Sequence, residues 1–288
     1  MPEKSQAPEY IMTLTCKDTP GIVAGVAGAL AASGCNIEES SQYGDAEAER
    51  FFMRVRFCAA PTLTRDDIYG ALIPLAKRFS MTWDLHTAGH KTRTIIMVSK
   101  FDHCLNDLLY RWRVGALPID ITRVVSNHKS AREIVEHAGL PFSHIPVTAK
   151  GKVAAEKKLR NLIKRDKTEL IILARYMQIL SDDLARGMFG HIINIHHSFL
   201  PGFKGARPYH KAHARGVKLI GATAHYVTPE LDEGPIIEQE TERVDHAMTV
   251  EDLITAGRDI ERRVLARAVK YHIEHRVLIN GRKTVIFR

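Results

Sequence analysis

Long hydrophobic runs are missing from this 288-residue sequence. No apolar run approaches the roughly 18 residues that a membrane span needs. The opening residues, MPEKSQAP, also lack the basic-then-apolar pattern of a secretory signal. We therefore expect a cytoplasmic protein that does not associate with a membrane.

Paired cysteines and histidine metal motifs are missing too. The four cysteines form no C-x-x-C pair and no metal-binding spacing, which favours reduced thiols over disulfides or structural zinc. They are Cys16, Cys35, Cys58 and Cys104. Six histidines lie between residues 191 and 225, but they lack the H-x-x-x-H spacing of a helical zinc site. No metal site is expected.

Positive charge is uneven along the chain. Residues 1–87 hold eight Lys and Arg against eleven Asp and Glu, a formal charge of −3, so residues 88–288 must carry +11 to give the net +8. A basic region suits an anionic ligand as well as a nucleic acid, so charge alone does not choose between them. The composition, 45% hydrophobic and 26% charged, is that of a globular protein.

Residues 1–87 show a regular succession of strand and helix patterns. Strands are predicted at 10–15, 36–43, 50–57 and 81–86, and helices at 21–33 and 64–78. This βαββαβ order is that of a ferredoxin-like domain. The turn DTPG, 18–21, leads into the first helix, with Pro20 able to be its first residue. The polar stretch 88–93 indicates a linker.

From Thr94 the pattern changes to repeated strand, helix, strand. Strands are predicted at 95–99, 119–126, 143–146, 170–174 and 192–196, and helices near 103–112, 131–138, 153–166 and 181–188. A long helix at 249–272 and short strands near 276–287 follow. We therefore predict an α/β domain over residues 94–288, Rossmann-like, with an open, mostly parallel sheet and helices on both sides. Ligands bind beyond the carboxyl ends of the strands in such folds.

Polar side chains mark the end of one predicted strand, in the segment IINIHHSFLPG, 192–202. Strand alternation sends Asn194 and His196 to one face, while His197 is predicted to lie on the other face in a structural role. A second polar segment, GATAHYVTPELDEGPIIEQ, 221–239, carries His225 on a strand and Asp232 on the following turn. We expect His225 to orient its neighbours rather than to react.

These residue types form a possible acid/base set. Asp232 would activate water, His196 would stabilise or protonate, and Asn194 would donate to a developing oxyanion, which indicates hydrolysis or acyl transfer. Glu230 and Glu233 are expected to favour the protonated form of Asp232 by like-charge repulsion. Direct attack is expected, because there is no G-x-S-x-G motif and no matching cysteine nucleophile.

Three segments resemble the folate-dependent formyltransferase family over about residues 93–288. They are LARYMQILS (173–181), NIHHSFLPGFKGARPYHKA (194–212) and the segment 221–239. The resemblance implies that Asn194, His196 and Asp232 are catalytic and that no separate cofactor is needed, because the folate is itself the substrate. The residues implied to line the folate pocket are Tyr176, Met177, Gln178, Leu180, Val227 and Glu230. Gly205 is expected to shape the site.

Other segments of the chain distinguish among the members of this family. The segment VSKFDHCLNDLL, 98–109, has no glycine where transformylases have a phosphate-binding loop, and His197 stands where they usually have proline. The chain resembles the formyltetrahydrofolate deformylases over nearly its full length. That resemblance implies hydrolysis of 10-formyltetrahydrofolate to tetrahydrofolate and formate, which balances the one-carbon pool and supplies formate for purine synthesis. The alternatives are formyl transfer to an amine such as glycinamide ribonucleotide, or a non-catalytic amino-acid sensor.

The first 87 residues resemble an ACT domain. The turn that begins at Asp18 and the segment GCNI, 34–37, match the region that binds amino-acid effectors in ACT domains. Asp18, Gly21 and Asn36 are the residues expected to contact such an effector. The resemblance also implies a homo-oligomer and no nucleic-acid partner.

Overall fold

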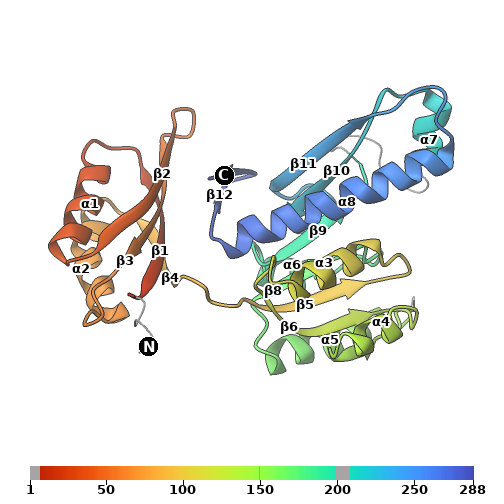
Figure 1. The fold of residues 1–288 in the computed structure, drawn as a ribbon, viewed down its shortest axis with the longest axis horizontal. Coiled ribbons are helices and arrows are strands. Elements are labelled where there is room, and N and C mark those ends of the chain that lie inside the picture. Colours follow the sequence, from red (N-terminus) through yellow and green to blue (C-terminus); the bar gives the residue numbers. More distant parts are fainter. Residues whose placement is uncertain (1–6, 149, 199–207) are drawn as a thin grey trace. The chain divides into compact units, whose positions relative to one another are not determined.

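A computed structural model describes residues 7–148, 150–198 and 208–288, and the chain forms two compact units. The first unit comprises the residues up to His90 together with Glu274–Asn280 and Val285–Arg288. The second comprises Lys91–Ile273 and Gly281–Thr284. Figure 1 shows a separate sheet in each unit.

The first unit has the predicted βαββαβ order, which confirms the ferredoxin-like fold. Its elements are β1 (Glu9–Lys17), α1 (Ile22–Ala32), β2 (Asn36–Asp45), β3 (Arg50–Cys58), α2 (Arg65–Arg78) and β4 (Thr82–Thr87). The strands pair antiparallel in the order β2-β3-β1-β4. Apolar side chains of both helices, such as Val26 and Leu72, are buried against alternate residues of the strands, such as Met12 and Val55.

The first helix begins later than the sequence predicts. Gly21 is the N-cap residue of α1 and has a φ of 94°, a left-handed conformation that glycine adopts without strain. Ile22 is therefore the first helical residue, and Pro20 lies in the preceding turn rather than in the helix.

The C-terminal residues pack with the first unit, whereas the predicted second domain extended to residue 288. After α8 they form the hairpin β12 (Val277–Asn280) and β13 (Lys283–Ile286). Leu278 and Phe287 pack on Phe52, and Arg276 pairs with Glu39 at 2.9 Å. Arg54, only 2% exposed, pairs with Glu39 at 3.0 Å and donates to the backbone oxygen of Glu274. A buried cation needs such partners, and the C-terminal residues supply one of them.

The second unit is an α/β domain, as predicted. Its first part contains β5 (Arg93–Val98), α3 (His103–Arg113), β6 (Asp120–Ser126), α4 (Arg132–His137), β7 (Phe142–His144), α5 (Lys152–Arg165) and β8 (Leu170–Leu173). Its second part contains α6 (Asp182–Gly187), β9 (Ile192–His196), α7 (Pro208–Arg215), β10 (Leu219–Tyr226), β11 (Ile236–Arg243) and α8 (Val250–Ile273). Helix α7 and strand β11 were not predicted.

The sheet of this unit is mixed. Its order is β11-β10-β9-β8-β5-β6-β7, with parallel pairs from β9 to β7 and antiparallel pairs of β10 with β9 and β11. Ala155 and Leu159 of α5 and Leu184 of α6 are buried in one cluster with residues of β5, β6, β8 and β9. Helix α8 contacts β9, β10, β11 and α3 (Figure 1). The end of β9 therefore lies between a parallel neighbour, β8, and an antiparallel neighbour, β10.

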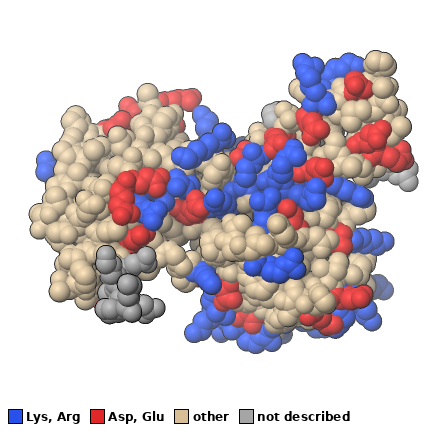
Figure 2. Space-filling model, in the orientation of Figure 1, with Lys and Arg blue, Asp and Glu red and all other residues tan. Residues whose placement is uncertain are grey.

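Positive charge gathers over α8. Figure 2 shows Lys and Arg side chains there, interleaved with acidic ones. Arg263 and Arg267 both pair with Glu240 of β11, so these cations bind the helix to the sheet edge. Among the described residues, none of the helices combines the length and apolar content needed to cross a bilayer.

Helix α2 offers a direct test of how local sequence stabilises the first unit. The hydroxyl oxygen of Thr64 accepts a hydrogen bond from the backbone N–H of Asp67, whose carboxylate accepts one from the N–H of Thr64. We expect Thr64→Ala to lower the free energy of unfolding by about 0.5–2 kcal/mol in urea denaturation. The control is Thr62→Ala, at an exposed position, which should change it by less than about 0.5 kcal/mol. Equal effects of the two changes would contradict the cap.

Candidate active site

A cavity of about 630 Å³ lies in the second unit, beside the carboxyl ends of β8 and β9. Asn194 and His196 of β9 line it, together with His225 of β10 and Asp232 of the loop that follows β10. The strand register explains why these side chains lie together, because Asn194 of β9 pairs directly with His225 of β10 in the antiparallel ladder. Alternation along β9 then sends His196 to the same side as Asn194.

His225 orients Asn194. Its Nδ1 lies 2.8 Å from the backbone oxygen of Tyr226, and a carbonyl only accepts, so Nδ1 carries the proton. Burial lowers the pKa of His225, which keeps the ring neutral. Its Nε2 therefore accepts from the side-chain amide of Asn194 at 3.2 Å. Within the described part of the chain, the second amide hydrogen of Asn194 has no acceptor and can donate to a ligand, which fits the predicted orienting role of His225.

His196 and Asp232 form the central pair of the site. Nδ1 of His196 lies 3.3 Å from Oδ2 of Asp232 and donates to it. His196 is 6% exposed, and among the described residues its Nε2 is buried with no hydrogen-bond partner. A buried nitrogen that lines a cavity without a partner is suited to a substrate atom.

The ionisation of Asp232 differs from the prediction. Burial raises its pKa, but the hydrogen bond and charge of His196, with smaller effects from His225 and His197, outweigh burial and hold the pKa below its usual value. The expectation that Glu230 and Glu233 favour protonated Asp232 is therefore wrong. Glu233 instead pairs with Arg282 at 3.1 Å. Asp232 is a carboxylate at neutral pH.

The loop that carries Asp232 is tightly constrained. Asp232 has a φ of 57°, a left-handed conformation that is uncommon outside glycine and typical of functional sites. Two residues later, a Cβ on Gly234 would lie 1.7 Å from the backbone oxygen of Tyr226. The loop also returns to β10, since the N–H of Tyr226 donates to the oxygen of Pro235. Only glycine fits this close approach.

The other predicted site residues divide into three groups. The predicted folate-pocket residues that line the same cavity are Tyr176, Met177, Gln178, Leu180 and Val227. Glu230 is exposed and is not part of the cavity lining, and Gly205 lies outside the described residues. Asp18, Gly21 and Asn36 belong to the first unit, where all three are exposed.

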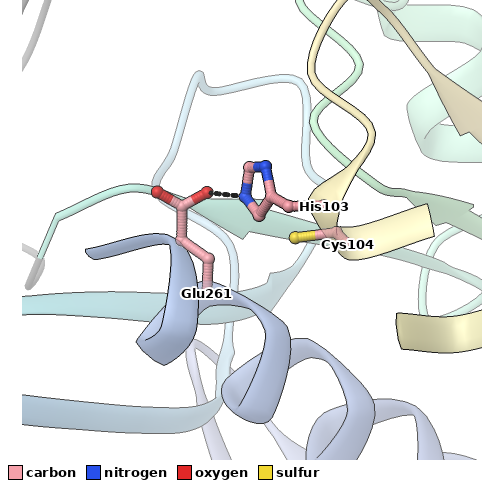
Figure 3. Close-up of side chains that lie close together, drawn as sticks. All are labelled: His103, Cys104 and Glu261. Carbon is pink, nitrogen blue, oxygen red and sulfur yellow. Dashed lines mark hydrogen bonds and ion pairs between the residues drawn. The ribbon is translucent and has the colours of Figure 1, made fainter. Parts of the chain in front are cut away.

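A second buried carboxylate, Glu261 of α8, lies at the same cavity and was missed by the sequence analysis. Figure 3 shows the ring of His103 directed at it from the start of α3, with Nε2 donating to Oε2 at 2.9 Å. The hydroxyl of Tyr209 donates to Oε1 at 3.0 Å, and Nε of Arg175 lies 3.3 Å from Oε2. Its only sequence signal is an acidic residue within the apolar stripe of α8.

Glu261, His103 and Cys104 come close enough to resemble a metal site, but their chemistry favours an ion pair. The cation of Arg175 already compensates Glu261, and burial raises the pKa of the Cys104 thiol well above its ordinary value, so Cys104 is not a thiolate. Burial acts to raise the pKa of Glu261, but His103 and Arg175 outweigh burial and hold the pKa below its usual value, so Glu261 is ionised. We regard Glu261 as the anchor of Arg175.

His197 also differs from its predicted place. Strand β9 ends at His196, so alternation no longer applies to the next residue, and His197 lines the cavity instead of lying on the opposite face. Its Nδ1 lies 2.7 Å from Nη1 of Arg175.

Comparisons with known proteins agree with this geometry. The formyl transferase family model matches residues 92–269, which contain the cavity, and the ACT domain model matches residues 10–65. A formyltetrahydrofolate deformylase of Corynebacterium sp. (strain P-1) is 49% identical over 286 residues, 99% of this chain and 100% of that protein. The chain belongs to the formyltetrahydrofolate deformylase family.

Further relatives extend the match to solved structures. A formyltetrahydrofolate deformylase of Bacillus subtilis (strain 168) is 48% identical, covering 96% of this chain and 93% of its own. The crystal structure of a formyltetrahydrofolate deformylase from Burkholderia mallei superimposes with a TM-score of 0.93 at 49% identity, over 98% of this chain and 100% of that one. The match to the solved structure therefore includes both units of the deformylase.

The close approach of Gly234 generates a prediction. We expect Gly234→Ala to push the Asp232 loop away from β10 and to lower kcat/KM by about 10²-fold, as a displacement of about 1 Å does in preorganised sites. Steady-state kinetics on 10-formyltetrahydrofolate would measure the loss. The control is Gly187→Ala at the end of α6, where an added Cβ meets no atom within 4 Å. Unchanged kinetics of Gly234→Ala would mean that the loop does not position Asp232.

Proposed function

We propose that Asn194, His196 and Asp232 carry out the reaction of this deformylase, the hydrolysis of 10-formyltetrahydrofolate to tetrahydrofolate and formate. Family membership supports the reaction. The observation that supports the residue roles is the His196–Asp232 pair at 3.3 Å, with the buried Nε2 of His196 left for substrate at a cavity that Asn194 also lines.

Asp232 is the base in this scheme. Its carboxylate uses Oδ2 to accept from His196, and Oδ1 accepts a hydrogen bond from the attacking water. As the water oxygen bonds to the formyl carbon, one water proton passes to Asp232. A low pKa does not prevent this step, since the proton is held only until the C–N bond breaks.

Asn194 and His196 stabilise the charge that forms on the formyl oxygen. The second amide hydrogen of Asn194 and a protonated Nε2 of His196 donate to this oxyanion, while Oδ2 of Asp232 keeps its hydrogen bond from Nδ1 of the same ring. The intermediate collapses when the C–N bond breaks and N10 takes the proton from Asp232. Formic acid then loses its proton to solvent and leaves as formate.

The apolar part of the cavity fits the pterin and benzoyl portions of a folate. Tyr176, Leu180 and Val227 line it close to the reacting groups. Burial raises the pKa of the Tyr176 phenol to about 12, so that the ring presents a neutral surface. This arrangement is typical of ligand sites that combine apolar walls with a few polar groups.

Other expectations from the sequence remain predictions. Binding of an amino-acid effector at Asp18, Gly21 and Asn36 fits the ACT match and the exposure of all three residues. The cytoplasmic location, the homo-oligomer and the supply of formate for purine synthesis are predictions of the same kind.

One experiment tests the acceptor. The protein is supplied with 10-formyltetrahydrofolate, with and without glycinamide ribonucleotide, and formate and formylated amine are measured. We expect formate at the same rate in both reactions, because water is the acceptor. Turnover that depends on the amine would support transfer, and intact 10-formyltetrahydrofolate in both reactions would support a non-catalytic sensor.

Replacing the base tests the residue roles. We expect Asp232→Asn to lower kcat by about 10²–10⁴ while KM changes little, because an amide cannot take the proton of water. The control is Asp183→Asn, an exposed acid in the first turn of α6, which should keep normal kinetics. Near-normal turnover of Asp232→Asn would remove Asp232 from the base role.

A further inference from the structure

His197 lies beside the proposed catalytic residues and has no role in the scheme above. Its ring stacks near that of His196, with centroids 5.0 Å apart and an interplanar angle of 28°. Both rings line the cavity. A polar side chain in this place is close enough to the reacting groups to need an assigned function.

Arg175 determines which nitrogen of His197 carries the proton. Nη1 of Arg175 lies 2.7 Å from Nδ1 of His197, and a guanidinium has only donors. Nδ1 must therefore be the acceptor and carry no proton. The remaining proton of the neutral ring is on Nε2, so His197 offers an N–H donor and has no free lone pair with which to act as a base.

The surroundings keep the ring of His197 neutral. Burial, followed by the positive charges of Arg175 and His196, lowers its pKa to about 4, although Glu261 and Asp232 act in the opposite direction. Tyr209 also lies near the ring, with its ring centroid 6.5 Å away, and burial raises the pKa of this phenol far above its usual value. His197 is thus a neutral donor at every pH well above 4.

Arg175 is itself held on several sides. Its backbone N–H donates to the oxygen of Leu173, and its backbone oxygen accepts from Ser99 at the end of β5. Arg175 has a φ of 63°, and Glu261 pairs with its side chain. His103 and Tyr209 in turn hold Glu261 from α3 and α7. These contacts make the direction of His197 a property of the fold.

We propose that His197 is a further catalytic residue: its Nε2–H donates to the oxygen of the attacking water and thereby selects water over amines as the acceptor. This rests on the proposed function of the site. Hydrolysis places two oxygens on one carbon, and Asn194 and His196 hold the one that belonged to the formyl group. His197 holds the other, which enters as water and leaves in formate.

The selection follows from lone pairs. Water has two, so its oxygen can accept a hydrogen bond from His197 with one and attack the formyl carbon with the other, while it gives a proton to Asp232. A neutral amine has a single lone pair, and accepting the same hydrogen bond would block its attack. A fixed N–H donor at the nucleophile's position therefore disfavours amines without any steric barrier.

The test measures how the formyl group divides between water and an amine. Methoxyamine is used because it is small, largely neutral at pH 7 and attacks through nitrogen, so the products are formate and N-methoxyformamide. We expect His197→Ala to lower kcat for formate by roughly 3–10-fold, the effect of one lost neutral hydrogen bond. The share of formyl passed to methoxyamine should rise, and His197→Gln, which keeps a side-chain N–H, should restore both values in part.

The controls separate this proposal from the base assignment. Exposed His213 of α7, changed to Ala, should keep the normal rate and division. Asp232→Asn should lose both products if Asp232 is the base. Retention of both products would overturn the base role of Asp232, but it would not bear on how His197 divides the formyl group between water and methoxyamine. An unchanged division in His197→Ala overturns the water-selecting role, whatever its rate of hydrolysis.

A measurement on the unaltered protein tests the donor state without a variant that must fold. Nitrogen-15 NMR of the histidine rings should show His197 with its proton on Nε2 at pH 7 and with a titration midpoint near 4. A ring with the proton on Nδ1, or an imidazolium at pH 7, would overturn the proposal. In Arg175→Met, with Arg175 as a positioning residue, the midpoint should rise and the two tautomers should mix.

Discussion

The hydrogen bond between His196 and Asp232 is the interaction on which the site depends. A carboxylate that is largely removed from water is stable only with a compensating partner, and Nδ1 of His196 provides it at 3.3 Å. The same bond ties the loop after β10 to the end of β9. Within that loop, Asp232 itself has a left-handed backbone conformation. Releasing the pair would therefore leave the charge of Asp232 without its partner, while the close packing of Gly234 on Tyr226 would still hold the loop.

Two carboxylates at one cavity, Asp232 and Glu261, are suited to different roles because their hydrogen-bond partners differ. Burial raises the pKa of Asp232 and of Glu261, and in both cases cationic or hydrogen-bonding partners lower it again. Both oxygens of Glu261 accept hydrogen bonds, from His103 of α3 and Tyr209 of α7, and Arg175 after β8 forms an ion pair with the same carboxylate. Oδ2 of Asp232 is committed to His196, whereas Oδ1 lies 3.7 Å from the unprotonated Nε2 of His225, which cannot donate to it. Glu261 is thus suited to hold other residues, while Asp232 has room for a water molecule.

Much of the site could be predicted from the sequence, and the failures have physical reasons. Alternation placed Asn194 and His196 on one face because strand β9 is regular up to His196. The same rule failed for His197, since it lies just beyond the strand. Glu230 and Glu233 are near Asp232 along the chain, but the turn leaves Glu230 exposed and commits Glu233 to Arg282. Strand β11 was missed because its sequence, IIEQETER, has too few apolar residues to alternate clearly. The Glu261 cluster joins distant elements, and no local pattern could predict its partners.

Arg175 sets both the tautomer and the charge of His197, and this coupling favours a neutral donor over a cationic one. A protonated His197 would stand beside Arg175 and His196, and only Glu261 and Asp232 would offset the repulsion among three cations. Each of those carboxylates is already committed to a partner of its own. A cationic donor would also hold the water oxygen more strongly and make it a weaker nucleophile. The neutral imidazole avoids this loss, since it fixes the direction of the water while it leaves the lone pair that attacks largely undiminished.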